Sequence, residues 1–188
     1  MKVTRLLFVF GVLIFLFNSS CSYAIRYDGT YSGKVVEADT GKPIEGVIVL
    51  GTWYAVAHTV AGGVHSYYDA QETATNKNGE FSIPGMGLRI MSNLEPMDIL
   101  IFKSGYEPLG SMQWKSLKVD ILVSKKIKWA GDKPIIPLKK LAMEERKKLG
   151  PPSRPSIPIE KMKLLTGEIN KERIELGLTP FELGGNNR

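Results

Sequence analysis

The 188-residue chain contains two histidines, His58 and His65, and they stand close together in the sequence. A glycine pair at residues 62–63 lies between them, and glycine pairs are favoured in two-residue hairpin turns because glycine adopts a positive φ without steric cost. With the turn at these glycines, Val60 faces His65 and His58 faces Tyr67. The two imidazoles then become diagonal neighbours on one face of the hairpin, about 7–8 Å apart.

A pair of histidines on one face could bind a metal ion, because imidazole nitrogen is a common metal ligand. Catalytic zinc usually has three protein ligands, so Glu72 or Asp69 would have to complete the set. The same hairpin register places Trp53 opposite Glu72. One hypothesis is therefore a metal-dependent or hydrolytic enzyme that uses His58, His65 and Glu72. The alternative is a pair of surface histidines without a ligand.

Four aromatic side chains on the same hairpin suggest a second kind of site. An aromatic face could bind a sugar or a peptide, and the candidates are Trp53, Tyr54, Tyr67 and Tyr68. Aromatic residues also favour strands for their packing alone, so these four could instead cover the open end of a β-sandwich. The sequence leaves both interpretations open.

Other signs of catalysis are weak. The chain has no Gly-x-Ser-x-Gly nucleophile motif, and its one cysteine, Cys21, lies in the N-terminal export segment. No cysteine is then available as a catalytic nucleophile in the mature chain. We therefore expect a protein that is not an enzyme and needs no cofactor.

Most of the central chain has the pattern of short strands separated by turns. Segments rich in Val and Ile, or with alternating polar and apolar residues, predict strands at residues 31–37, 44–50, 80–83, 98–103, 117–123 and 133–138. Turn-forming residues follow several of them, as at residues 39–43 and 76–79. The hairpin that carries the candidate sites occupies an insertion at residues 52–72. This pattern predicts an all-β sandwich spanning residues 25–138.

The C-terminal segment, residues 139–188, has a different character. Residues 139–149 and 159–176 have helical spacing, and a proline-rich linker at residues 150–158 separates them. Met162, Leu165, Ile169 and Leu176 form an apolar stripe on the second predicted helix. The stripe could pack on the sandwich or on a partner, or it could adsorb to an anionic membrane through the neighbouring lysines.

Three sequence blocks resemble carboxypeptidase regulatory-like domains, and they occur in the order typical of that family. They are GKVVEADTGKPIEGV at residues 33–47, TNKNGEFSIP at residues 75–84 and IFKSGY at residues 101–106. The resemblance covers residues 31–110 and implies a small Greek-key, transthyretin-like sandwich that serves as an accessory module. Asn76 stands where the family often has Asp, and the insertion at residues 52–72 is longer than the family's usual link.

The N-terminus has the layout of an export signal. Lys2 and Arg5 precede an apolar run at residues 6–17, which is too short for a normal membrane span. Residues 22–24 suit ordinary signal cleavage after Ala24. Alternatively, residues 19–21 resemble the end of a bacterial lipoprotein box with Cys21 as the lipidated residue, although the usual aliphatic residue is replaced by Asn18. We expect residues 1–24 to be a signal peptide and the mature protein to be periplasmic or extracellular, with membrane attachment only through Cys21 or an uncleaved signal.

The charge distribution argues against nucleic acid as a partner, despite a net charge of +6 and a pI of about 9.3. Residues 25–138 contain 12 Lys and Arg and 12 Asp and Glu, a net charge of 0, whereas residues 139–188 contain 11 and 7, a net charge of +4. Phe181 is the one aromatic residue in that basic segment, so it lacks the stacking platforms of single-strand binders. The expected partner is an envelope protein or a glycan, which the sequence does not identify. The sequence therefore favours an exported, non-enzymatic accessory or binding module of the bacterial cell envelope. A further alternative is a structural envelope component, which would associate with itself through an exposed sheet edge.

Overall fold

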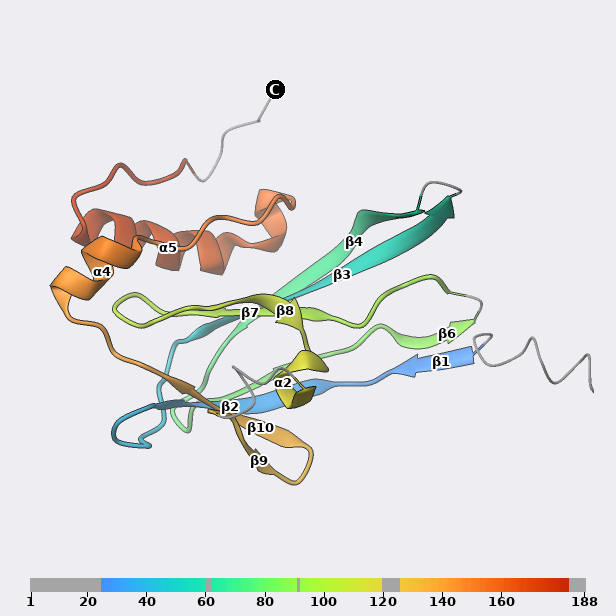
Figure 1. The fold of residues 1–188 in the computed structure, drawn as a ribbon, viewed down its shortest axis with the longest axis horizontal. Helices are drawn as coiled ribbons and strands as arrows, with labels where there is room; N and C mark the ends of the chain where they lie inside the picture. Colours follow the sequence, from blue (N-terminus) through green and yellow to red (C-terminus); the bar gives the residue numbers. More distant parts are fainter. Residues whose placement is uncertain (1–24, 60–61, 91, 120–125, 183–188) are drawn as a thin grey trace, which may run out of the picture. The chain divides into compact units, whose positions relative to one another are not determined.

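A computed structural model describes residues 25–59, 62–90, 92–119 and 126–182. These residues form two compact units. The smaller unit comprises residues 25–29 and 85–93, and the larger comprises residues 30–84 and 94–182 (Figure 1). The predicted signal peptide, Cys21 and the predicted cleavage site lie outside the described residues.

The smaller unit is a two-stranded antiparallel ribbon of β1 (Ile25–Asp28) and β6 (Gly87–Ile90). Ile25 pairs with Ile90, and Tyr27 pairs with Leu88. Asp28 Oδ2 accepts a hydrogen bond from the backbone N–H of Met86 at 2.9 Å. The ribbon was not predicted, because its strands have only four residues each and no tight turn joins them.

Two four-stranded sheets form the body of the larger unit. In the first sheet the order is β5 (Glu80–Ile83), β2 (Tyr31–Glu37), β10 (Lys133–Leu138) and β9 (Lys128–Ala130). In the second sheet the order is β4 (Gly62–Ala74), β3 (Ile48–Thr59), β7 (Asp98–Phe102) and β8 (Leu109–Gln113). All pairs are antiparallel except β2 and β10, which run parallel.

The two sheets face each other across an apolar core. Alternation along β2 and β10 turns Val35 and Ile136 inward, where they are 0% and 2% exposed. Tyr31 of the first sheet packs edge to face on Trp53 of the second, with ring centroids 6.2 Å apart. The larger unit is thus a mainly β, sandwich-like body.

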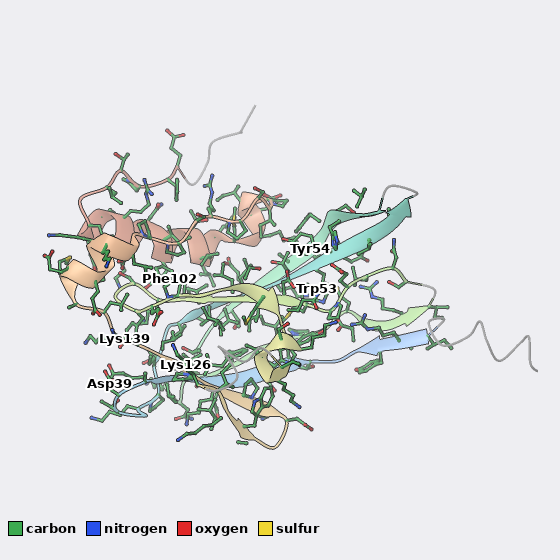
Figure 2. All side chains as sticks on the ribbon, in the orientation of Figure 1. Asp39, Trp53, Tyr54, Phe102, Lys126 and Lys139 are labelled. Carbon is green, nitrogen blue, oxygen red and sulfur yellow. The ribbon has the colours of Figure 1, made fainter. Side chains whose placement is uncertain are left out.

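The second sheet is also buried on its outer face, because the C-terminal segment folds onto it. Its outward residues join residues of the C-terminal segment in one apolar cluster of Ile48, Leu50, Ala70, Leu100, Phe102, Ile157, Met162, Leu165 and Ile169. Figure 2 shows Phe102 between β7 and α5 (Lys163–Glu175). A sheet buried on both faces needs nearly continuous apolar strands, and residues 47–50 and 99–102 meet that requirement.

Several predicted elements agree closely with the structure. The strands predicted at residues 31–37, 80–83 and 133–138 have the same bounds as β2, β5 and β10. The helix predicted at residues 139–149 begins later, as α4 (Met143–Leu149). The helix predicted at residues 159–176 is divided into a 3₁₀ turn, η1 (Ile159–Lys161), and α5.

One predicted strand is wrong over its described part. At residues 117–123 the sequence predicted a strand, but the chain forms a short helix there, α2 (Ser116–Val119), and residues 120–125 lie outside the described chain. Hydrogen bonds from Leu117 N–H to the Trp114 carbonyl and from Lys118 N–H to the Lys115 carbonyl form this helical turn. Periodicity in so short an apolar stretch does not distinguish a strand from a helix.

The predicted hairpin register is also wrong. The glycines at residues 62–63 belong to β4 and pair with Thr59 and His58, so Val56, and not Val60, faces His65. A bulge between Trp53 and Tyr54 shifts the register further along the hairpin. The base of β3 is buried on both faces of the sheet, and this tertiary packing outweighs the turn preference of a glycine pair.

Candidate functional site

Three of the residues predicted to bind a metal, His65, Glu72 and Asp69, have other partners in the structure. Both carboxylate oxygens of Glu72 accept hydrogen bonds from the start of α5, at 2.8 Å from Leu164 N–H and 3.0 Å from Leu165 N–H. His65 Nδ1 lies 2.9 Å from Glu95 Oε2. Asp69, the alternative third ligand, forms an ion pair with Lys161 at 2.7 Å.

These partners separate the predicted ligand set. Glu72 faces Leu50 in the strand register, and not Trp53, so its side chain lies under α5. His58 belongs to β3 and pairs with Gly63, and its side chain is outside the described structure. Within the described ranges, no group of three or more His, Cys, Asp or Glu side chains could hold a metal ion.

The four hairpin aromatics do not share one exposed face. Trp53 is 0% exposed and packs on Tyr31 in the sandwich core. Tyr67 packs against the apolar cluster under α5. Tyr54 is half-buried, and Tyr68 is 49% exposed. The predicted aromatic binding face is therefore incorrect as a set, because Trp53 and Tyr67 serve the packing of the two sheet faces.

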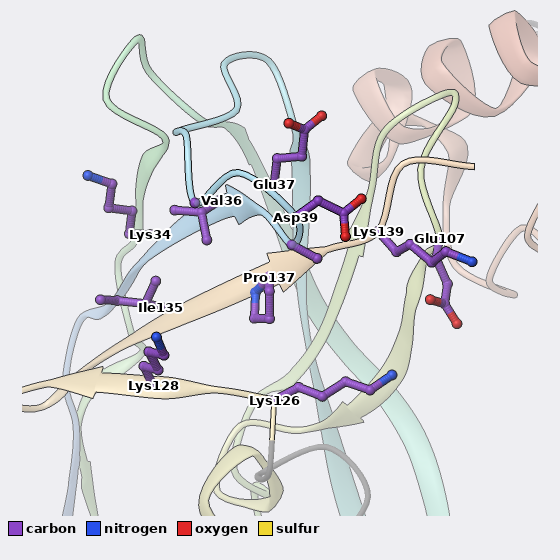
Figure 3. A pocket seen from close by; sticks show the side chains of 12 residues that line it. Lys34, Val36, Glu37, Asp39, Glu107, Lys126, Lys128, Ile135, Pro137 and Lys139 are labelled. Atoms are coloured by element: carbon purple, nitrogen blue, oxygen red, sulfur yellow. The ribbon is translucent and has the colours of Figure 1, made fainter. Parts of the chain in front are cut away.

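A candidate site that the sequence did not indicate lies on the outer face of the first sheet. There, outward residues of β2, β10 and β9 line an open groove of about 630 Å³ (Figure 3). The groove residues are Lys34, Val36, Glu37, Ala38, Asp39, Gly41, Glu107, Lys126, Lys128, Ile135, Pro137 and Lys139. We call this surface the lysine groove.

One row of paired residues forms the basic end of the lysine groove. Ile135 on β10 pairs with Lys34 on β2 and with Lys128 on β9. Paired residues point to the same face of a sheet, so the two lysines flank the Ile135 side chain, as Figure 3 shows. In the part of the chain that the structure describes, neither lysine forms an ion pair.

The next row and the adjoining loops form the other end of the groove. Val36 pairs with Pro137, which extends the apolar floor begun by Ile135. A backbone hydrogen bond of 2.8 Å from Glu107 N–H to the Lys139 carbonyl fixes the loop that follows β7 beside this row. Asp39 lies near Lys139 and Glu107 in Figure 3. This end therefore carries both signs of charge.

Lys139 is already paired within the protein. Its Nζ lies 2.6 Å from Glu145 Oε1 of α4. The hydrogen bond between them raises the pKa of Lys139 and lowers the pKa of Glu145. Lys139 is therefore less available to a ligand than Lys34 and Lys128.

Two further hollows adjoin the lysine groove. One, of about 600 Å³, shares Lys34 and Ile135 with it and continues over Ser32, Ser82 and Lys133. The other, of about 220 Å³, shares the groove wall on the β10 side and is lined in addition by Ile127 and Leu138. The first two hollows share Lys34 and Ile135, and the lining of each combines apolar with polar residues, which is a typical composition for a ligand site.

Sequence reasoning missed this site because its members are far apart in the chain. Lys34 and Lys128 are brought together only by the parallel pairing of β2 with β10. A parallel pair connects distant strands, so no local turn signal reveals it. The one available signal was the alternation of Lys34 and Val36 with the buried residues of β2, which indicated an outward face.

A second polar cluster joins the two C-terminal helices to the sandwich. Arg146 of α4 donates to Glu172 and Glu175 of α5 and to Ser104 Oγ. Glu172 also accepts hydrogen bonds from the Gly105 N–H and the Ser104 hydroxyl, both at 2.9 Å. The cluster is largely buried and has its polar atoms paired, so we assign it a structural role.

A third cluster lies at the base of the hairpin. Asp98 pairs with Thr52 in the sheet and has Glu95 and His65 nearby. Burial and then the charge of Glu95 raise the pKa of Asp98, whereas His65 lowers it. Shifted carboxylates beside a histidine occur both in active sites and in structural ion pairs.

Comparisons with known proteins identify no family. No protein-family model matches the sequence, and no curated protein matches it. A solved structure of the Streptococcal ancillary pilin has a TM-score of 0.32 and 12% sequence identity with this chain. That match covers 61% of this chain and 30% of the pilin chain. Among the described helices, none is both long enough and apolar enough to span a membrane.

Proposed function

We propose that the chain is an exported, non-enzymatic binding module of the bacterial cell envelope, and that the lysine groove is its contact surface for a partner. The observation that carries this proposal is an asymmetry between the two sheets. The outer face of the second sheet is covered by α5, whereas that of the first sheet is hollowed and carries Lys34 and Lys128. Lysines without ion pairs beside an apolar floor are available to a partner of complementary charge.

The cellular location in this proposal rests on the N-terminal sequence. A short basic region, an apolar run at residues 6–17 and small residues before Ile25 favour export. Mass spectrometry of the mature N-terminus tests it. Cleavage before Ile25 gives a periplasmic or extracellular protein, a lipidated Cys21 gives an anchored one, and an intact Met1 in the cell envelope fraction would contradict signal processing.

We also propose that the larger unit is a carboxypeptidase regulatory-like, transthyretin-like sandwich. The three sequence blocks behind this resemblance form compact turns. Asn76 Oδ1 accepts the N–H groups of Asn78 and Glu80, both at 2.9 Å, and Gly41 N–H donates to the Glu37 carbonyl at 2.8 Å. An experimental structure of the larger unit, compared with members of that family for strand order, tests the assignment.

The non-enzymatic part of the proposal rests on the surroundings of His65. Its side chain is 57% exposed, and its partner Glu95 is 27% exposed, which is typical of a surface ion pair. The shifted Asp98 nearby is the one observation that favours hydrolysis instead. Esterase and peptidase assays of the mature protein and of His65→Ala distinguish the two, since activity that depends on His65 would reject our proposal.

Site-specific photo-crosslinking tests the contact surface. A photoreactive amino acid at position 39, on the rim of the lysine groove, should capture an envelope partner in living cells, whereas the same amino acid at position 148, on exposed α4, should not. Capture should disappear when Lys34→Glu and Lys128→Glu are added. Equal capture at both positions, or capture that survives the double substitution, would reject the groove as the contact surface.

A further inference from the structure

The spacing of charges across the lysine groove restricts the shape of what can bind there. Lys34, Ile135 and Lys128 occupy three neighbouring strands in one row. Strands are about 4.8 Å apart, so the lysine Cα atoms lie about 10 Å apart with the isoleucine between them. Glu80 of β5 pairs with Lys34 on the other side and ends the row there. A ligand that used Lys34, Ile135 and Lys128 would present an apolar group at its centre and an anionic group on each side.

An extended peptide has this arrangement on one of its faces. Residues i and i+2 of an extended chain point the same way and lie about 7 Å apart. The pattern Glu-x-Leu-x-Glu therefore places a leucine between two carboxylates, within reach of two flexible lysine side chains. Because the row crosses three strands, such a segment lies across the sheet and not along its strands.

The chemistry of the floor favours a protein segment over a glycan. Val36, Ile135 and Pro137 give the groove an aliphatic floor. Phe81, the aromatic side chain in the adjoining hollow, is 5% exposed and offers no open ring face. Aliphatic side chains pack well on such a floor, while lysine acts as a mobile point charge for carboxylates.

Building on the proposed function, we infer that the lysine groove binds an extended, acidic protein segment, with one aliphatic side chain on Ile135 and carboxylates two residues to either side at Lys34 and Lys128. The opposite end, where Asp39 and Glu107 lie, repels further carboxylates. A segment that lies across the row does not run toward that end, so its carboxylates are limited to those that meet Lys34 and Lys128. Pro137 has no N–H to donate, so recognition at that position depends on side chains and not on added strand pairing.

Peptide titrations test the inference directly. The probe is a labelled peptide with Glu-Ser-Leu-Ser-Glu at its centre, added to the mature protein and followed by NMR. Its isomer with Glu-Leu-Ser-Ser-Glu has the same composition but turns leucine to the opposite face. We expect the isomer to bind about tenfold more weakly, and Lys34→Glu with Lys128→Glu to weaken the probe by a similar factor. Lys148→Glu with Lys163→Glu, which makes the same change in net charge outside the groove, should leave binding unchanged.

The remaining outcomes separate this inference from the proposed function. Equal binding of probe and isomer, or tighter binding of an oligogalacturonate, would overturn the inference. Failure of every peptide while crosslinking at position 39 still captures a lysine-dependent partner would overturn the inference and leave the binding function standing. Failure of both experiments would reject both.

Discussion

The guanidinium of Arg146 on α4 donates to both carboxylate oxygens of Glu172 on α5, at 2.9 Å and 2.6 Å. Their side chains are 10% and 5% exposed, so the pair is held away from water. The same carboxylate accepts the N–H of Gly105 in the loop after β7. One carboxylate thus connects two helices with the sandwich.

Removal of the arginine should be costly for this reason. Arg146→Met leaves Glu172 buried without its cation, and loss of one partner of a buried pair typically costs about 3–5 kcal/mol. Urea unfolding of wild type and variant measures the change in the free energy of unfolding. Lys147→Met, at an exposed position of the same helix, should change it by less than about 0.5 kcal/mol. Equal effects of the two substitutions would contradict the assigned role of Arg146.

The same carboxylate should make stability depend on pH. Burial alone would raise the pKa of Glu172, but hydrogen bonds from Arg146, the Gly105 N–H and Ser104 lower it below the ordinary value of 4.5. Its stabilising contribution is therefore complete above pH 4.5 and is lost as the pH falls through the lowered pKa. Glu172→Gln should be less stable than wild type at pH 7, and the difference should shrink at pH 3. A stability difference between Glu172→Gln and wild type that is the same at pH 7 and pH 3 would contradict a stabilising charge on Glu172.

Glu72 provides a separate test of how α5 is held. Because its carboxylate accepts two N–H groups at the start of the helix, Glu72→Ala should cost about 1 kcal/mol and speed amide exchange at Leu164 and Leu165. Gln71→Ala is the control from the same strand, and it should leave exchange in α5 unchanged. If the Leu164 and Leu165 amides still exchanged slowly in Glu72→Ala, the Glu72 carboxylate would not be what holds the start of α5.

Gly33 should tolerate no side chain. A Cβ at this position would lie 2.9 Å and 3.0 Å from ring atoms of Phe81 and 3.0 Å from the Pro134 carbonyl oxygen. Gly33→Ala should therefore destabilise the protein by about 1–3 kcal/mol, as overpacking does. Gly110→Ala is the matched control, since a Cβ there meets no atom within 4 Å. Thermal unfolding of both variants checks the difference, and equal midpoints would contradict it.

Local sequence signals predicted several strands correctly for identifiable reasons. β2, β5 and β10 combine alternating burial with adjacent turn formers such as the Asn76 turn, and both signals act over a few residues. β8 and β9 escaped prediction because they are short and partly polar. The bulge beside Trp53 escaped it because the packing of distant residues sets the hairpin register.

The candidate sites show the same limit more strongly. The sequence suggested His65, Glu72 and the aromatic residues as site residues because of their residue types. Residue type alone does not reveal that the Glu72 carboxylate binds the start of a helix 92 residues later. Lys34 and Lys128 are ordinary in sequence, and the pairing of β2 and β9 on either side of β10 makes them neighbours. In the sequence, Arg146 is one of several basic residues in the C-terminal segment. In the structure it is the most buried residue of α4.

The covering of the second sheet by α5 has a consequence for biosynthesis. Ile48, Leu50, Leu100 and Phe102 all precede α5 in the chain, so the ribosome synthesises the apolar sheet face before the helix that covers it. During that interval the nascent chain exposes an apolar surface of the kind that chaperones recognise. Premature termination between β10 and α5 should therefore yield a chaperone-bound or proteolysed fragment and not a smaller working domain.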